Sequence, residues 1–168
     1  QEERMVTNLL DLPSKATEVF ERHDEIRRMA AIVAGARDVL YLGRGAMFPV
    51  ALEGALKLKE ITYIHAEAYA AGEMKHGPIS LIDSTVPVVA TVPSGPLFEK
   101  TLSNLQEAKA RGGRLLVFTD MAGAPRLREI AECVVAIPTV DEFVAPILQT
   151  IPVQILCSDS TNCQDAIP

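Results

Sequence analysis

The sequence predicts a single α/β domain in which a parallel sheet of about five strands is covered by helices on both faces. The chain has 168 residues, of which 48% are hydrophobic, so it can fill one buried core but not two. Short apolar runs bounded by turn residues alternate with longer helical stretches. This alternation is typical of βαβ crossovers and therefore of a doubly wound parallel sheet.

The N-terminal residues divide into a linker and a first helix. Leu12-Pro13-Ser14 is a stop-and-cap signal that follows a polar stretch. An amphipathic helix dense in charge is expected over 15–34, with Gly35 placed to end it. The expected boundaries are a linker over 1–13, the folded domain over 14–156 and an atypical C-terminal tail over 157–168.

The rest of the domain is expected to alternate between strands and helices. Residues 65–71 either form a short strand or continue the helix before them. The predicted strands are 38–43, 87–92, 114–119 and 133–138, and the predicted helices are 48–61, 97–111, 124–131 and 143–156. Gly112-Gly113 ends one helix just before a strand, as connections of this kind commonly require.

Composition excludes several classes of partner. A formal net charge of −6 without a basic cluster argues against nucleic acid, and no apolar run approaches the roughly 20 residues of a membrane helix. Cys133, Cys157 and Cys163 show no CxxC spacing and form no recognisable metal site with the three histidines. We therefore expect no metal, no cofactor and a reducing, cytoplasmic location.

The ligand crevice of a doubly wound domain lies beyond the carboxyl ends of its strands. The loops after residues 42, 92 and 119 are therefore the predicted crevice. Gly43-Arg44-Gly45 leaves the first strand, but Phe48 stands where a dinucleotide-binding loop would have its third glycine. We interpret these glycines as a tight turn and predict no nucleotide site.

The helix over 48–61 carries the first candidate site. Glu53, Lys57 and Glu60 fall within a sector of roughly 60°, and Glu53 precedes Lys57 in the order that favours an ion pair. These side chains are either a solvated salt-bridge stripe or part of a catalytic site. The opposite face carries small and apolar residues suited to packing on the sheet: Ala51, Ala55, Leu58 and Thr62.

The second candidate site is the Lys-His-Gly-Pro turn. Glu67, Glu73, Lys75 and His76 are expected to gather near the end of the same helix, with Lys75 as the charged neighbour of His76. A carboxylate, an amine and an imidazole brought together suit proton transfer on a carbonyl compound, such as enolisation or sugar ring opening. The alternative is a histidine that caps a turn, and Gly77-Pro78 would fix the loop in either case.

Much of the chain resembles a known family. The stretch ALEGALKLKEITYIHAEAYAAGEMKHGPISLID (51–83), with LPSKATEVF, YLGRGAMFP, ARGGRLLVFTD and VAPILQTIPVQIL, is similar to glutamine–fructose-6-phosphate aminotransferases. It resembles the second of the two sugar isomerase (SIS) domains in their isomerase portion. The resemblance implies a flavodoxin-like sheet and a cytoplasmic homodimer. It also implies a reaction in which fructose 6-phosphate and glutamine-derived ammonia give glucosamine 6-phosphate, the first step of amino-sugar synthesis.

The resemblance also implies roles for the candidate residues. Glu60 in KLKE corresponds to the glutamate that moves a proton between C1 and C2, with Lys57 beside it. His76 in KHGP corresponds to the histidine of sugar ring opening, which in this family reaches into the neighbouring subunit's site. Glu53 in ALEG is expected to orient Lys57.

The segment also departs from the family. The glutaminase domain and the first SIS domain have no counterpart in it. The loop 92–101 has Pro96 and Leu97 where a phosphate loop would use hydroxyls, and the tail 157–168 has no counterpart of the Schiff-base lysine. We therefore expect the segment alone to be inactive. The alternatives are a non-catalytic module that binds a phosphosugar and a structural half used for dimerisation.

Overall fold

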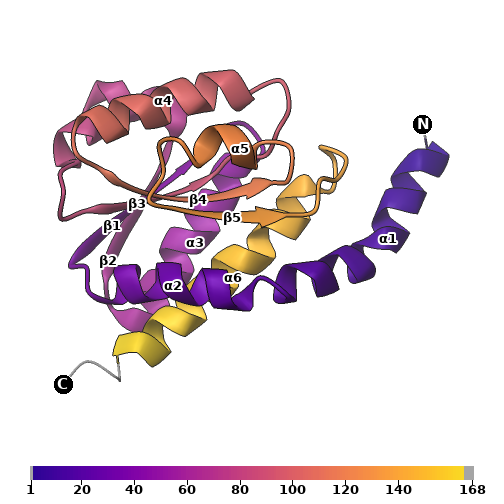
Figure 1. Cartoon of the computed structure of the whole chain (residues 1–168), viewed down its shortest axis with the longest axis horizontal. Helices are drawn as coiled ribbons and strands as arrows, with labels where there is room; N and C mark the ends of the chain where they lie inside the picture. The colour runs from indigo at the N-terminus through magenta and orange to yellow at the C-terminus, as the bar shows by residue number, and fades with distance from the viewer. Residues whose placement is uncertain (1, 165–168) are drawn as a thin grey trace.

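The chain forms one five-stranded parallel sheet in the order β2-β1-β3-β4-β5. The computed structural model describes residues 2–164, and Figure 1 shows their arrangement. The strands are β1 (Asp38–Gly43), β2 (His65–Ala70), β3 (Pro87–Thr91), β4 (Arg114–Asp120) and β5 (Cys133–Ile137). The predicted fold class is confirmed.

Helices cover both faces of this sheet (Figure 1). The helices are α1 (Glu2–Phe20), α2 (His23–Ala34), α3 (Met47–Thr62), α4 (Phe98–Ala110), α5 (Ala124–Leu127) and α6 (Ala145–Gln164), with two 3₁₀ helices, η1 (Ala71–His76) and η2 (Pro78–Leu81). One core lies between the sheet and α2, α3 and α6. The other lies between the sheet and α4, α5 and η1.

The strands are apolar because both of their faces are buried. All five residues of β3 are buried, as are six of the seven residues of β4. Tyr41 and Phe118 point to the α6 side, whereas Leu42 and Val117 point to the α4 side. This double burial is the reason why continuous apolar runs identified the strands of a parallel sheet.

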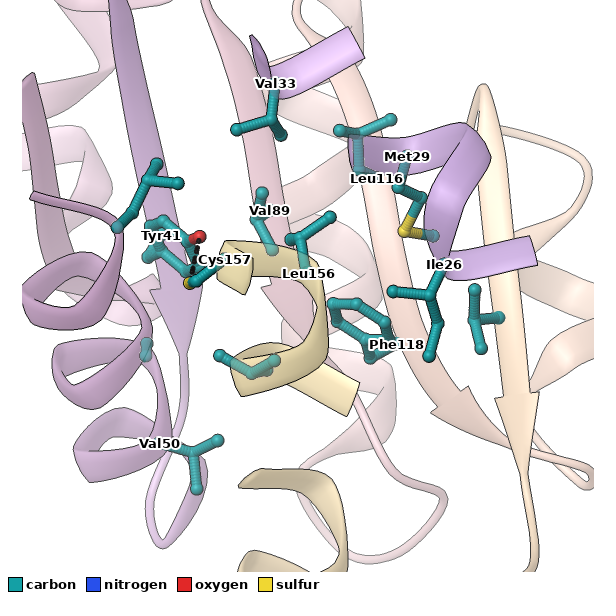
Figure 2. Packing of buried hydrophobic residues seen from close by; sticks show 14 of the residues in the cluster. Ile26, Met29, Val33, Tyr41, Val50, Val89, Leu116, Phe118, Leu156 and Cys157 are labelled. Atoms are coloured by element: carbon teal, nitrogen blue, oxygen red, sulfur yellow. Dashed lines mark hydrogen bonds between the residues drawn. The ribbon is translucent and has the colours of Figure 1, made fainter. Parts of the chain in front are cut away.

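On the α6 side, α6 lies against α2, α3 and the sheet. Figure 2 shows Leu156 of α6 among Ile26, Met29 and Phe118. Tyr41 Oη lies 3.7 Å from Cys157 Sγ, with both side chains buried. Burial is the main cause that raises the pKa of the Cys157 thiol to about 11, and it also raises the pKa of Tyr41.

The N-terminal structure differs from the expected linker and single helix. Residues 2–13 belong to α1, which continues through Pro13, and a break at Glu21-Arg22 separates α1 from α2. Thr17 Oγ1 donates a hydrogen bond to the Pro13 carbonyl within this helix, and Leu12 packs against the core. The Leu12-Pro13-Ser14 signal predicted a stop followed by a helix cap, whereas α1 runs through Pro13, which lacks the backbone N–H that would donate within the helix.

Part of the expected C-terminal tail is helical. Residues 157–164 continue α6, in which Cys157 and Ser160 are fully buried. Thr161 Oγ1 donates to the Ile61 carbonyl at 3.3 Å, which ties this part of the tail to α3. Residues 165–168 of the expected tail lie outside the described residues.

Candidate functional site

The helix α3 presents the first candidate residues on its outer face. Lys57 Nζ lies 2.8 Å from Glu60 Oε2, and this hydrogen bond is the main cause that raises the pKa of Lys57 above its ordinary value. The opposite face packs on the sheet as expected, with four buried residues: Ala51, Ala55, Leu58 and Thr62. The helical geometry read from the sequence is therefore confirmed.

The contact made by Glu53 differs from the expected one. Its Oε1 accepts a hydrogen bond from Gln154 Nε2 of α6 at 3.0 Å, whereas Lys57 pairs with Glu60. The charge of Glu53 still contributes to raising the pKa of Lys57. Gln154 was not identified from the sequence, because a glutamine in an apolar helix carries no signal of its partner on another helix.

The turn before α3 is tight, as the glycines predicted. A Cβ on Gly43 would overlap the backbone of Met47, so only glycine fits at the end of β1. Gly45 has a positive φ of 57°. The turn starts α3 immediately beyond the carboxyl end of β1 and thereby sets which face of the helix meets the sheet.

His76 is the last residue of η1 and is largely exposed, with 73% of its side chain accessible. Its Nδ1 lies 2.8 Å from Glu73 Oε2. Lys75 turns instead toward α4, where its Nζ lies 2.8 Å from Glu107 Oε1. The expectation that Lys75 is the charged neighbour of His76 is therefore wrong, because the side chain that contacts the imidazole is the Glu73 carboxylate.

The structure does not bring Glu60 and His76 together. β2 lies parallel to β1, with Ala70 opposite Gly43, so η1 follows the carboxyl end of the sheet. Glu60 lies at the other end, because α3 runs back from Met47 and separates Glu60 from that edge by about 20 Å. The expected gathering of these residues near one end of the helix is wrong within a single chain.

A pocket of about 300 Å³ lies beyond the carboxyl ends of β1 and β3, where the strand order reverses. Its walls include Arg44, Ser94, Thr101 and Glu142. Asp120 holds Ser94 in place, because Asp120 Oδ2 accepts hydrogen bonds from both the backbone nitrogen and the hydroxyl of Ser94. The rule for doubly wound sheets thus located the pocket, but none of the four candidate residues lines it.

Residues 32–160 match the SIS domain. The chain belongs to the SIS domain family. This assigns the doubly wound fold to a known class of domain. The SIS domain was anticipated from the sequence motifs, and the match confirms that interpretation.

Several relatives of this SIS domain share one name with each other. The chain is 72% identical over 156 residues to glutamine–fructose-6-phosphate aminotransferase [isomerizing] of Gluconobacter oxydans, covering 93% of this chain. It is 56% identical over 131 residues to the protein of that name from Sphingobium yanoikuyae, covering 78% of this chain and 84% of that one. The chain spans only 26% of the Gluconobacter oxydans relative.

A solved structure supports the same relationship. The C-terminal domain of glucosamine-fructose-6-phosphate aminotransferase from Francisella tularensis superimposes with a TM-score of 0.89 at 41% identity. The match covers 94% of this chain and 44% of that one. The resemblance to the aminotransferases that the sequence motifs indicated is therefore confirmed.

Residues 2–164 offer neither a membrane-spanning helix nor a cluster of metal ligands. No helix in this range is long and apolar enough to cross a membrane. In the same part of the chain, no three His, Cys, Asp or Glu side chains are grouped closely enough to hold a metal ion.

Proposed function

We propose that this SIS domain is part of the isomerase portion of an aminotransferase that makes glucosamine 6-phosphate. The substrates are fructose 6-phosphate and ammonia released from glutamine, and the product enters amino-sugar synthesis. The observation that supports this most directly is the Lys57–Glu60 pair at 2.8 Å on the outer face of α3. It stands in a chain that is 72% identical over 156 residues to an enzyme of that name.

Glu60 is proposed as the base that moves a proton between adjacent carbons of the sugar. Its carboxylate is partly exposed and is paired with an ammonium group, which balances the negative charge. Proton transfer between C1 and C2 requires one group that takes the proton and returns it to the neighbouring carbon. Lys57 would then hold the carboxylate in place, and Glu53 with Gln154 would support the same face of α3.

His76 is proposed to open the sugar ring. The neutral imidazole would take the proton of the anomeric hydroxyl. The anomeric carbon would then become a carbonyl carbon, and its bond to the ring oxygen would break with the electron pair going to that oxygen. The imidazolium would return the proton to that oxygen. Under this proposal the Lys-His-Gly-Pro turn presents a catalytic group, whereas under the alternative it holds a histidine that only caps a turn.

The two proposed residues require two copies of the chain. Glu60 and His76 lie at opposite ends of the sheet, farther apart than one sugar ring spans. A symmetric homodimer could place His76 of one copy beside Glu60 of the other, because a two-fold axis relates the same surfaces of both copies. The homodimer is therefore part of the proposal.

Further domains are also part of the proposal. Four apolar side chains along α3 and just beyond it are exposed beside the Lys57–Glu60 pair: Leu52, Leu56, Ile61 and Tyr63. Tyr63 is the most exposed of the four, with 92% of its surface accessible. An exposed apolar stripe of this kind is typical of an interaction surface. The first SIS domain, which would hold most of the sugar phosphate, is the proposed neighbour, and a glutaminase domain would supply ammonia. A cytoplasmic location is supported by three free cysteines.

The test is complementation between two variants of the complete enzyme. His76→Asn and Glu60→Gln should each lower turnover by about 10²-fold or more, the usual scale for losing a general base. After subunit exchange, about half of the dimers are mixed and each has one intact site, so about a quarter of wild-type activity should return. The 168-residue chain alone should give no product.

A control chain carrying both substitutions should rescue neither variant. Normal turnover by Glu60→Gln would mean that the pair is only a solvated salt bridge. Inactive single variants without rescue in a mixture would refute the shared site while leaving both residues as candidates.

The pocket favours a second candidate function, a module that binds a phosphosugar without catalysis. It has the size and position of a ligand site, at the reversal of strand order. Calorimetric titration of the 168-residue chain with fructose 6-phosphate separates the two functions. A module should bind tightly alone, whereas a fragment of an enzyme whose phosphate is held by another domain should bind weakly.

A further inference from the structure

We propose that Glu73 is a positioning residue for His76, which holds the imidazole proton on Nδ1 and leaves Nε2 free to accept a proton. The inference rests on the proposed role of His76 in ring opening. Its basis is the 2.8 Å separation of His76 Nδ1 and Glu73 Oε2. Within residues 2–164, Glu73 is the side chain that hydrogen-bonds this imidazole.

The 3₁₀ geometry of η1 creates this pair. A 3₁₀ helix has about three residues per turn, so side chains three positions apart lie directly above one another. Residues 73 and 76 have this spacing, and η1 spans Ala71–His76. In an α-helix the same residues would be rotated apart by about 60°, so the unusual helix type brings the carboxylate into line with the ring.

The side of η1 opposite the pair is buried. Ala71 and Met74 of η1 are fully buried in the core beneath α4. Gly77 ends the helix with a φ of 144°, a conformation that favours glycine, and no atom lies within 4 Å of where its Cβ would be. The outer face of η1 therefore presents Glu73 and His76, while its inner face fixes their position.

Other charged groups around η1 have partners elsewhere. Lys75 is tied to Glu107 of α4 at 2.8 Å. Arg44, from the loop after β1, lies against Gly72 and donates to Asn104 Oδ1 at 3.0 Å. The neighbouring helix η2 contains no charged residue. Glu73 is therefore the charged group that acts on His76 directly.

A carboxylate can only accept hydrogen bonds, so the ring nitrogen facing it must carry the proton. The neutral imidazole then has its lone pair on Nε2, which points away from Glu73. When Nε2 takes the proton of the sugar hydroxyl, the oxygen–hydrogen bond breaks, a nitrogen–hydrogen bond forms and the ring becomes positive. The adjacent carboxylate stabilises that charge. Because the side chains of Glu73 and His76 are 67% and 73% accessible, the pair contributes little to folding.

The first test is the ¹⁵N NMR spectrum of the 168-residue chain, which has only three histidines. The spectrum of wild type should show His76 protonated on Nδ1 when it is neutral. Glu73→Ala should shift the proton toward Nε2. The control Glu107→Gln removes a carboxylate that contacts the same 3₁₀ helix through Lys75, and it should leave the His76 signals unchanged. An Nε2-protonated ring in wild type would overturn the proposal.

The second test is a double-mutant cycle in the complete enzyme. Glu73→Gln should lower kcat by about 10-fold with little change in KM, less than the loss of about 10²-fold or more expected for His76→Asn. In the His76→Asn background, Glu73→Gln should cause no further loss, because it acts through the imidazole. If Glu73→Gln lowered kcat equally in the wild-type and His76→Asn backgrounds, the proposed role of Glu73 would be refuted, while that of His76 would be unaffected. A His76→Asn enzyme with normal kcat would instead refute the proposed function of His76, whatever the NMR result.

Discussion

Gly54→Ala is expected to destabilise the domain, although alanine is the better helix former. Gly54 lies where α3 packs against β1 and α6, and a Cβ there would lie 2.6 Å from Tyr41 Cε1 and from Val153 Cγ1. Both neighbours are buried, with 1% and 0% of their surface accessible, and so neither can move aside freely. The helix would have to shift outward together with Lys57 and Glu60.

The two opposing effects have different sizes. Overpacking of a core by one methyl group typically costs about 1–3 kcal/mol, whereas replacing an interior helical glycine by alanine returns up to about 1 kcal/mol. Because the added Cβ would lie 2.6 Å from two buried side chains, the overpacking cost should be in the upper part of its range, about 2–3 kcal/mol, and the expected net loss is about 1–2 kcal/mol. For a domain of this size, that loss lowers Tm by roughly 2–8 °C.

Thermal and urea unfolding of the 168-residue chain would measure this loss. Gly35→Ala is the matched control, because Gly35 has a φ of −85° and its Cβ would meet only the Ile32 carbonyl at 3.9 Å. That variant should unfold within about 0.5 kcal/mol of wild type. If Gly54→Ala unfolded at the same temperature as wild type or above it, the close approach of α3 to β1 would not be a constraint, and the reasoning would be wrong.

Two other predictions concern ionisation and backbone strain. The Cys157 thiol has a pKa raised from 9.0 to about 11 by burial. An unfolded chain therefore loses this proton at lower pH than the folded one, and the free energy of unfolding should fall by about 1–3 kcal/mol as pH rises across that interval. Urea unfolding should show that the free energy of unfolding falls less between about pH 8 and about pH 10.5 in Cys157→Ala than in wild type. An equal fall in both proteins would mean that other groups cause the effect. Gly77→Ala should cost about 1–3 kcal/mol through its backbone alone, because φ is 144° and its Cβ would meet no atom. Unchanged unfolding of this variant would show that the joint between η1 and η2 adapts without strain.

The fold was predictable because its strongest signals are local in sequence. A strand buried on both faces must be apolar throughout, so the runs around Leu40, Val89 and Leu116 identified β1, β3 and β4. The outer face of α3 followed from helical periodicity alone, and the pairing of Lys57 with Glu60 lies within that periodicity. These features depend on no contact between distant parts of the chain.

The features that were missed depend on tertiary packing. Nothing in the sequence around Pro13 distinguishes a helix start from a helix interior, yet Leu12 packs on the core and α1 continues through the proline. The 3₁₀ helix η1 has Ala71 and Met74 buried beneath α4, a contact between segments that are far apart in the sequence. Because the sequence did not indicate a 3₁₀ helix, we expected Lys75 to be the nearest charge to His76. In the structure the Lys75 ammonium instead pairs with Glu107 of α4.

The separation of Glu60 from His76 follows from the connectivity of the sheet. Only fifteen residues lie between them, but β2 occupies six of these and runs the full height of the sheet. A strand that begins at the end of α3 must deliver the following loop to the opposite edge, because parallel pairing with β1 sets its direction. A short sequence interval therefore separates the two side chains widely in space. Under the proposed roles, each copy would have its base at one end and its imidazole at the other, so both residues could act on one sugar only in a pair of copies such as the proposed symmetric dimer.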